Sequence, residues 1–255
     1  MSKTKAFTLV ELAIVLVVIG LVVGGVMAGQ SMLRASDLQS IISDVARYKS
    51  ITSSFKEKYG SFPGDMNNAT STWEAAPACP AAGTNQQTCN GNGDGQIYNW
   101  SNAATSYEMF RFWQHLVLSG MLEGDFTGAA GSGGALEAVP GVNVPTSRLG
   151  GGYTMAYIGI MNGNAIRFDG DWGHIIRLGN FGTATAANAN IFSVADARVI
   201  DIKMDDGAPA TGSVVTYKKA NGTTSENCAS SNAVTAIYDN TQVGIQCILE
   251  FKTGF

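Results

Sequence analysis

The sequence predicts an α+β protein in which a long N-terminal helix, half transmembrane and half amphipathic, packs on a mainly antiparallel β-sheet head with extra helices and disulfide loops. Three observations predict this class. Residues 12–33 contain no charged side chain, and these 22 residues are enough for a helix to cross a bilayer. Apolar residues then recur at helical spacing as far as Tyr59. Beyond Tyr59, short apolar runs are separated by turn residues, as in antiparallel strands.

Composition narrows the classes of function. The 255 residues carry 16 Lys and Arg against 20 Asp and Glu, a net charge of −4. That balance excludes the basic surface of a nucleic-acid binder, so no nucleic-acid partner is expected. Hydrophobic residues make up 45% of the chain, which indicates a folded core. Only two histidines are present, and they leave little for a histidine-based catalytic or metal site.

At the N-terminus, basic residues precede an apolar run, as in a membrane-inserted segment. Lys3 and Lys5 precede the apolar run, which places the N-terminus in the cytoplasm and exports the chain beyond Arg34. A secretory signal carries its small-residue cleavage site after the apolar core. Here the small residue beside the basic stretch is Ala6, on the other side of that core.

Glu11 lies near the start of this apolar segment, where a carboxylate is costly unless it is paired. No Lys, Arg or His lies between Phe7 and Arg34. If the chain is cut after Ala6, the new amine of Phe7 supplies a positive charge, from the same chain or from a neighbouring subunit. The alternative is that Glu11 reaches up to the lipid headgroups.

Residues 6–12, Ala-Phe-Thr-Leu-Val-Glu-Leu, and the apolar run to Gly20 resemble the class III signal of type IV pilins and of the pseudopilins of type II secretion. The resemblance implies that a prepilin peptidase cuts between Ala6 and Phe7 and that Phe7 is N-methylated. It also implies that Glu11 pairs with the amine of an adjacent subunit during assembly. Two features depart from the pattern: Ala6 replaces the usual Gly, and the Pro that many members carry beyond the position of Gly20 is missing.

These features divide the chain into four parts: a leader (1–6), a transmembrane or filament-core helix half (7–33), an amphipathic helix half (34–59) and a globular head (60–255). One helix over 7–59 would be about 80 Å long. Gly60 and Pro63 end it. The alternative is an ordinary single-pass anchor followed by a juxtamembrane helix.

Four glycines interrupt the apolar half, in two pairs with small-xxx-small spacing: Gly20 with Gly24 and Gly25 with Gly29. Such pairs let helices approach closely. Each glycine also weakens the helix, and the resemblance implies local melting near Gly20. The alternative is the ordinary use of glycine in transmembrane helices.

The head should contain two further helices, over 107–121 and from the capping residue Ser193 to about Met204. In the first, Glu108, Arg111 and His115 belong to a polar face. Residues 124–152 are rich in glycine and predict a surface excursion. Strands are expected at 153–160, 165–168, 174–178, 214–217, 233–238 and 244–251.

Four cysteines permit three disulfide connectivities. Disulfides are expected because an exported head meets an oxidising compartment. The cysteines fall into two groups along the sequence, so we expect local pairs, Cys79 with Cys89 and Cys228 with Cys247. The second pair resembles the C-terminal disulfide loop of type IV pilins. No C-x-x-C motif is present, which disfavours thiol redox catalysis and a zinc ribbon.

One segment suggests calcium as a cofactor. Asn90, Asn92 and Asp94 fall at positions 1, 3 and 5 of a calcium loop, with Gly at position 6. Position 12 is Ser101 instead of the usual Glu, so Glu108 or Asp65 would have to complete the site. The alternative is a Gly/Asn turn held by the neighbouring Cys89 bridge.

Taken together, these features predict a structural subunit of a type IV pilus-like extracellular filament and no enzyme, since no nucleophile elbow or phosphate-binding loop is present. Its partners would be other copies of itself, the prepilin peptidase, an inner-membrane assembly platform and a cytoplasmic ATPase. The precursor would lie in the inner membrane and the product on the cell surface. The alternatives are a pseudopilin or minor pilin of a type II secretion or DNA-uptake system, and a monomeric membrane-anchored binding protein or hydrolase.

Overall fold

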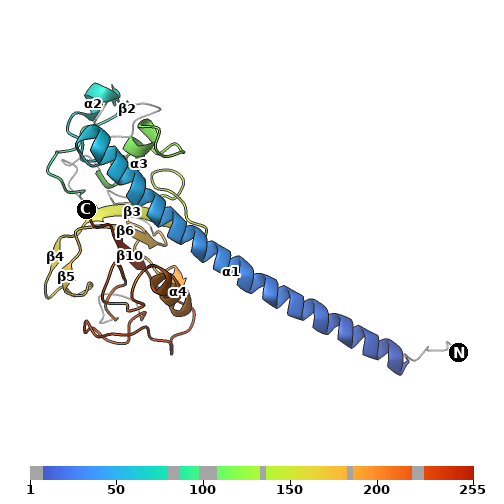
Figure 1. Cartoon of the computed structure of the whole chain (residues 1–255). Helices are drawn as coiled ribbons and strands as arrows, with labels where there is room; N and C mark the ends of the chain where they lie inside the picture. Colours follow the sequence, from blue (N-terminus) through green and yellow to red (C-terminus); the bar gives the residue numbers. More distant parts are fainter. Residues whose placement is uncertain are drawn as a thin grey trace. The chain divides into compact units, whose positions relative to one another are not determined.

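The computed structural model describes residues 8–77, 79, 87–97, 108–132, 136–182, 186–219 and 227–255 (Figure 1). The chain forms two compact units, Met1–Ser40 and Ile41–Phe255. Helix α1 (Leu9–Tyr59) has residues in both units.

In the first unit, α1 is a continuous helix from Leu9 onward, and its side chains are exposed as far as Leu33. In the second unit, one face of α1 is buried. Its members recur at spacings of three and four residues, as expected for an amphipathic helix: Ile41, Val45, Tyr48, Thr52 and Phe55.

The helix α1 ends where the sequence predicts. Gly60 takes a positive φ of 74°, which only glycine adopts without strain, and its N–H donates to the Lys56 carbonyl at 2.8 Å. Residue Pro63, three positions on, cannot continue a helix.

The head is built on a four-stranded antiparallel sheet with the order β3-β6-β10-β8. Its strands are β3 (Gly152–Tyr157), β6 (His174–Gly179), β10 (Leu249–Lys252) and β8 (Val214–Val215). Tyr153 of β3 packs edge-on to Tyr48 of α1 with ring centroids 5.1 Å apart, and its hydroxyl donates to Asp44 Oδ2 at 3.0 Å. These contacts attach the second part of α1 to the sheet.

Helix α3 (Glu108–Leu118) packs on the same aromatic cluster, since the ring of Trp113 lies 4.9 Å from that of Tyr48. The prediction of a polar face for α3 is correct in composition but wrong in environment. Glu108, Arg111 and His115 are each at most 1% exposed. They are buried because β2 (Gln87–Thr88) and the residues after it cover this face.

The remaining elements have two to four residues each, except for helix α4, the second of the two helices predicted for the head. They are α2 (Ala69–Thr72), β1 (Glu74–Ala75) paired in parallel with β2, β4 (Ile160–Met161) with β5 (Gly170–Asp171), and β7 (Phe192–Ser193) with β9 (Ile245–Cys247). Helix α4 (Val194–Met204) begins at the predicted cap, where Ser193 Oγ accepts from the Asp196 N–H.

The predicted strand at 165–168 is wrong, and the one at 233–238 is correct only at its end, where Tyr238 forms an isolated antiparallel bridge with Ala229. At 165–168, the N–H groups of Ile166 and Arg167 both donate to Asn164 Oδ1 at 2.8 Å, so the chain turns instead of extending. At 233–238, the Ala236 N–H bonds the Ala233 carbonyl in a turn. In both places a local hydrogen bond takes the group that a strand would pair with its neighbour.

The predicted surface excursion at 124–152 is correct only in part, because its described residues include both exposed and buried side chains. Phe126, Ala138 and Val144 are buried. Asn143 is 1% exposed, and its side chain forms hydrogen bonds with three backbone groups of this segment. Its Nδ2 donates to the carbonyls of Ala129 and Glu137, and its Oδ1 accepts from the Val139 N–H. A single buried amide thus satisfies the backbone of an irregular segment.

A buried ion cluster lies across the sheet. Glu250 on β10 accepts from Arg177 Nε of β6 and from Arg167 Nη2, both at 2.7 Å. Burial works to raise the pKa of Glu250, but the two guanidiniums outweigh it and hold the pKa at about 2. Glu250 therefore forms buried ion pairs with both Arg167 and Arg177.

Candidate functional site

The first turn of α1 is closed by Thr8 and Glu11. Glu11 Oε2 accepts hydrogen bonds from the Thr8 N–H at 2.8 Å and from Thr8 Oγ1 at 2.9 Å, and Thr8 Oγ1 accepts from the Glu11 N–H at 3.2 Å. This reciprocal pair is a capping box. Its signal, Thr followed by Glu three residues later, is present in the sequence, but our sequence analysis assigned Thr8 no role.

Within the part of the chain that the structure describes, Glu11 Oε2 takes both of these bonds and no hydrogen bond reaches Oε1. The side chain is exposed. Thr8 thus orients the carboxylate and leaves one oxygen for another donor. Ala6 and Phe7 lie outside the described residues, so the pairing of Glu11 with a Phe7 amine stays a prediction.

The apolar side chains of α1 in the first unit are exposed. Leu9 is 86% exposed, and Leu21 and Met32 are each 78% exposed. Among the described residues, α1 is the one helix long and apolar enough to cross a membrane, by length and composition, with a mean hydropathy of 2.8 and no buried residue in its best window. Exposed apolar surface of this extent is typical of a segment that contacts lipid or other protein.

The four glycines of this segment are not required by contacts inside the chain. A Cβ built on Gly20, Gly24, Gly25 or Gly29 meets nothing within 4 Å. Within the first unit, the described residues thus give no packing reason for these glycines. Their predicted use, close approach of other helices, remains a prediction.

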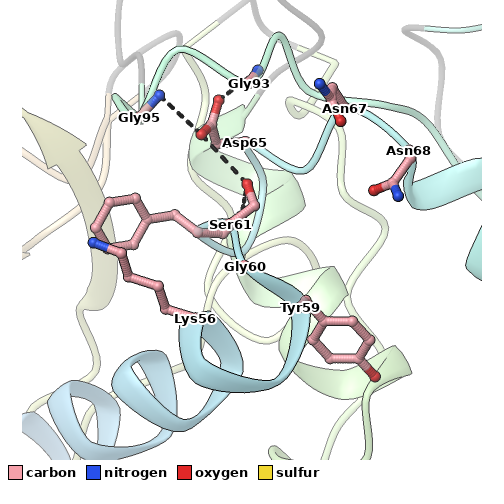
Figure 2. A pocket seen from close by; sticks show the side chains of 10 residues that line it. Lys56, Tyr59, Gly60, Ser61, Asp65, Asn67, Asn68, Gly93 and Gly95 are labelled. Carbon is pink, nitrogen blue, oxygen red and sulfur yellow. Dashed lines mark hydrogen bonds between the residues drawn. The ribbon is translucent and has the colours of Figure 1, made fainter.

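The predicted calcium loop folds around Asp65. The Asp65 carboxylate accepts from the backbone N–H groups of Gly93 at 2.7 Å and of Asp94 and Gly95 at 3.0 Å (Figure 2 shows the bonds at Gly93 and Gly95). Asp65 is 2% exposed. Burial raises its pKa, while the three N–H groups act in the opposite direction. The loop thus closes on a carboxylate of the chain itself.

The other predicted ligands also bond to the protein. Asn90 Oδ1 accepts from the Thr70 N–H at 2.8 Å, and Glu108 Oε1 accepts from the Asn92 N–H at 3.0 Å. Asn92 and Asp94 bond to each other, Nδ2 to Oδ2, at 2.9 Å. The structure therefore brings Glu108, at the start of α3, to the loop that holds Asn92 and Asp94. It turns Asn90 toward α2. Calcium binding there remains a prediction.

Within the described ranges, the carboxylates that lie close enough to share a cation belong to a different place. Asp201, Asp205 and Asp206, at the end of α4, have oxygens within 4.8 Å of one another. Each of them accepts hydrogen bonds from its own surroundings: Asp201 from the Tyr238 hydroxyl, Asp205 from the Val214 N–H, and Asp206 from the Ala208 N–H. This group needs no cation to be satisfied.

A pocket of about 310 Å³ lies between the end of α1 and the Asp65 loop (Figure 2). Lys56, Tyr59, Ser61 and Asn68 line it, together with Asp65. Lys56 Nζ lies 4.1 Å from the centroid of the Phe62 ring, a cation–π contact. The walls carry hydrogen-bonding groups that suit a small polar molecule.

Both histidines are held inside the head. His115 Nδ1 accepts from the Gly64 N–H at 3.0 Å, so Nε2 carries the proton and donates to Thr88 Oγ1 at 3.0 Å. Burial, with the charge of Arg111, lowers the pKa of His115 to about 3. His174 is 3% exposed, and burial lowers its pKa as well. Neither side chain is placed to exchange protons with a substrate.

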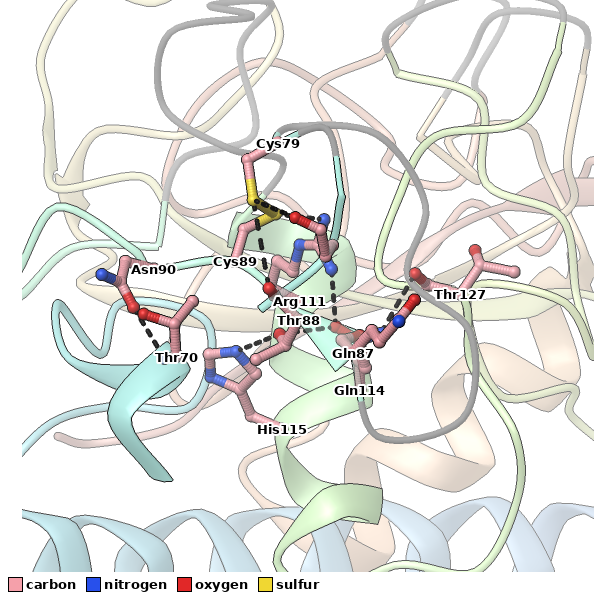
Figure 3. The surroundings of a disulfide bond; sticks show 11 residues. Thr70, Cys79, Gln87, Thr88, Cys89, Asn90, Arg111, Gln114, His115 and Thr127 are labelled. Carbon is pink, nitrogen blue, oxygen red and sulfur yellow. Dashed lines mark hydrogen bonds between the residues drawn. A yellow bond between two sulfur atoms is a disulfide. The ribbon is translucent and has the colours of Figure 1, made fainter. Parts of the chain in front are cut away.

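The disulfides join the local pairs that the sequence predicts, Cys79 with Cys89 and Cys228 with Cys247. Figure 3 shows the first pair beside Arg111, which donates from Nη2 to Cys89 Sγ at 3.1 Å. The guanidinium also donates to Gln114 Oε1 at 2.7 Å. Sequence analysis had placed Arg111 on a polar face without assigning it a partner.

Comparison with known families decides the nature of the N-terminal segment. Residues 1–27 match the prokaryotic N-terminal methylation motif. They form a prepilin signal. No curated protein and no solved structure matches the chain.

The prepilin signal is shared by type IV pilins and pseudopilins, and it implies processing by a prepilin peptidase and a membrane-anchored precursor. It also points to a structural protein. The match ends within α1 and does not extend to the head.

Proposed function

We propose that this chain is a structural subunit of a type IV pilus-like extracellular filament, assembled by bundling of α1 helices after the leader is removed. The prepilin signal at residues 1–27 is the observation that carries this proposal. The exposed apolar side chains from Leu9 to Leu33 support it, because a bundle of such helices would cover them after they leave the lipid.

Glu11 is the proposed assembly residue. In this mechanism its carboxylate pairs with the methylated Phe7 amine of the neighbouring subunit, which sets the position of each incoming subunit along the filament. The capping box supports this role, because Thr8 holds Oε2 and leaves Oε1 available. The open space around the four glycines, Gly20 to Gly29, would allow neighbouring helices to approach closely.

The proposed partners follow from this mechanism. Copies of the chain are the main partners, and a prepilin peptidase, an inner-membrane platform and a cytoplasmic ATPase would process and assemble them. The precursor would reside in the inner membrane and the filament on the cell surface. The head would carry no enzymatic activity, and its role would be to form the outer face of the filament.

Electron microscopy of sheared surface material tests the proposal, with N-terminal sequencing of the subunit. Filaments whose subunit begins at N-methylated Phe7 are the expected result. Glu11→Ala should abolish or severely reduce filaments while the chain still inserts in the membrane. Glu57→Ala, an exposed acidic residue on the same helix, is the matched control and should leave filaments intact. Normal filaments from Glu11→Ala would refute the pairing role.

A pseudopilin or minor pilin of a type II secretion or DNA-uptake system is the second candidate. The size of the head, residues 60–255, and the absence of Pro from the apolar half of α1 favour keeping it. Counting subunits per filament separates the two: thousands indicate a major pilin, and a few at the tip indicate a minor one. A chain that keeps Met1 and forms no filaments would instead indicate a monomeric membrane-anchored protein.

A further inference from the structure

The two disulfides of the head differ in access. Cys79 is exposed, whereas Cys89 is 1% exposed and both Cys228 and Cys247 are fully buried. A thiol from solution can therefore approach one sulfur of the first bridge, that of Cys79, while burial shields the second bridge on both sides.

A cation lies beside the first bridge. Arg111 Nη2 lies 3.1 Å from Cys89 Sγ, the buried sulfur of the first bridge (Figure 3). Burial lowers the pKa of Arg111 to about 10, so the guanidinium remains protonated at neutral pH. A cation beside a sulfur stabilises the thiolate form, and a stabilised thiolate is a better leaving group in thiol–disulfide exchange.

We propose that Cys79 is a site of thiol exchange, at which a low-molecular-weight thiol such as glutathione becomes covalently attached. The incoming thiolate attacks Cys79 Sγ and forms a new S–S bond there. The Cys79–Cys89 bond breaks, and its electron pair goes to Cys89 Sγ, where the Arg111 guanidinium stabilises the negative charge. One disulfide is consumed and one is formed, so the step needs no oxidant or reductant beyond the thiol.

The surroundings of Arg111 keep this sulfur in place when the bridge opens. Gln114 Oε1 accepts hydrogen bonds from Arg111 Nη1 at 2.7 Å and from Thr88 Oγ1 at 2.8 Å. Thr88 directly precedes Cys89 in the sequence. The buried thiolate therefore stays beside the guanidinium, and the exposed sulfur carries the adduct. Return of Cys89 to the mixed disulfide releases the thiol and closes the bridge again.

The test uses the full chain in detergent, exposed to reduced glutathione, quenched with acid and alkylated, followed by mass spectrometry of the cysteine peptides. The expected product has glutathione on Cys79 and an alkyl group on Cys89, with Cys228–Cys247 intact. Exchange at the first bridge should be faster than at the second by about tenfold or more. An adduct on Cys89, or equal rates at the two bridges, would overturn the proposal.

Substitutions at Arg111 test whether the guanidinium stabilises the Cys89 thiolate. Arg111→Met should slow exchange about tenfold, since it removes the charge, and Arg111→Lys should retain much of the rate. The second bridge is the internal control, because a general loosening of the head would make Cys228–Cys247 reactive too. An unchanged rate in Arg111→Met would refute the role of the guanidinium.

A second variant avoids any change at Arg111. In Cys79→Ser, which alters an exposed residue, Cys89 becomes a free thiol while the other bridge stays closed. The ultraviolet absorbance of its thiolate, followed against pH, should give a pKa below the ordinary value of about 8.5. A value at or above that would contradict the proposal.

Discussion

Removal of the Asp65 carboxylate should destabilise the head more than removal of any exposed acidic side chain. Asp65→Ala removes the carboxylate that accepts from three backbone donors, the N–H groups of Gly93, Asp94 and Gly95. The N–H groups of Gly93 and Asp94 keep a second acceptor, the Asp65 carbonyl at 2.9 Å and Asn92 Oδ1 at 3.0 Å. The substitution also leaves the loop without the group around which it folds. The side chain itself is 2% exposed, so its removal also leaves a buried position unfilled.

The magnitude follows from these bonds. A hydrogen bond to a charged acceptor contributes about 1.5–3 kcal/mol, and burying the charge offsets part of that gain. Because Gly93, Asp94 and Gly95 lie on the exposed side of the loop, water can reach their N–H groups once the carboxylate is gone. We therefore expect about 1 kcal/mol per bond and about 3 kcal/mol in all.

Thermal unfolding, followed by tryptophan fluorescence, measures this loss. For a domain of this size, about 1 kcal/mol corresponds to roughly 2–4 °C, so the melting temperature should fall by about 6–12 °C. Asp125→Ala is the matched control, because Asp125 is exposed, and it should change the free energy of unfolding by less than about 0.5 kcal/mol. A loss below about 1 kcal/mol for Asp65→Ala would refute the reasoning that the loop depends on this carboxylate.

Four further predictions concern other parts of the molecule. Glu250→Gln should lower the free energy of unfolding, measured by urea titration, by about 3–5 kcal/mol, because it leaves two buried guanidiniums beside a neutral amide. Asp201→Asn should flatten the dependence of stability on pH between 3.8 and about 7. Burial raises the pKa of Asp201 to about 7, so the unfolded chain loses this proton at lower pH than the folded chain, and wild-type stability falls as the pH rises through that window. Thr8→Ala should reduce filament yield less than Glu11→Ala does, because it removes the capping box but keeps the carboxylate. Calcium at millimolar concentration should raise the melting temperature of the wild type and leave that of Asp94→Ala unchanged, if the loop binds it.

Each of these has its own check. Wild-type stability for Glu250→Gln would mean that the two arginines find other partners. Asp206→Asn, at an exposed neighbour, should keep the pH dependence that Asp201→Asn removes. Thr8→Ser should restore the filament yield lost in Thr8→Ala, since Ser also forms a capping box. Equal melting temperatures with calcium and with a chelator would leave the Asp65 carboxylate as the sole centre of the loop.

Local patterns in the sequence predicted the helices well. The end of α1 at Tyr59, the helix α3 and the capped start of α4 at Ser193 follow from residue spacing, from Gly60 and from a Ser side chain that bonds its own backbone. Both disulfides also join cysteines close in sequence. The prediction of a short strand failed at 165–168, and at 233–238 it holds only for the bridge at Tyr238. A run of four to six residues cannot reveal whether a neighbouring strand will pair with it.

The sequence alone determined the prepilin signal, the apolar helix with its single carboxylate, and the two longer helices of the head. These depend on residues within a few turns of one another. Only the tertiary structure decided where the buried polar groups go: Asp65 into the loop 93–95, Arg111 onto the Cys89 sulfur, and Glu250 between two arginines that lie 73 and 83 residues away. The physical reason is that a charge can be buried only where partners satisfy it, and those partners come from parts of the chain that folding alone brings together.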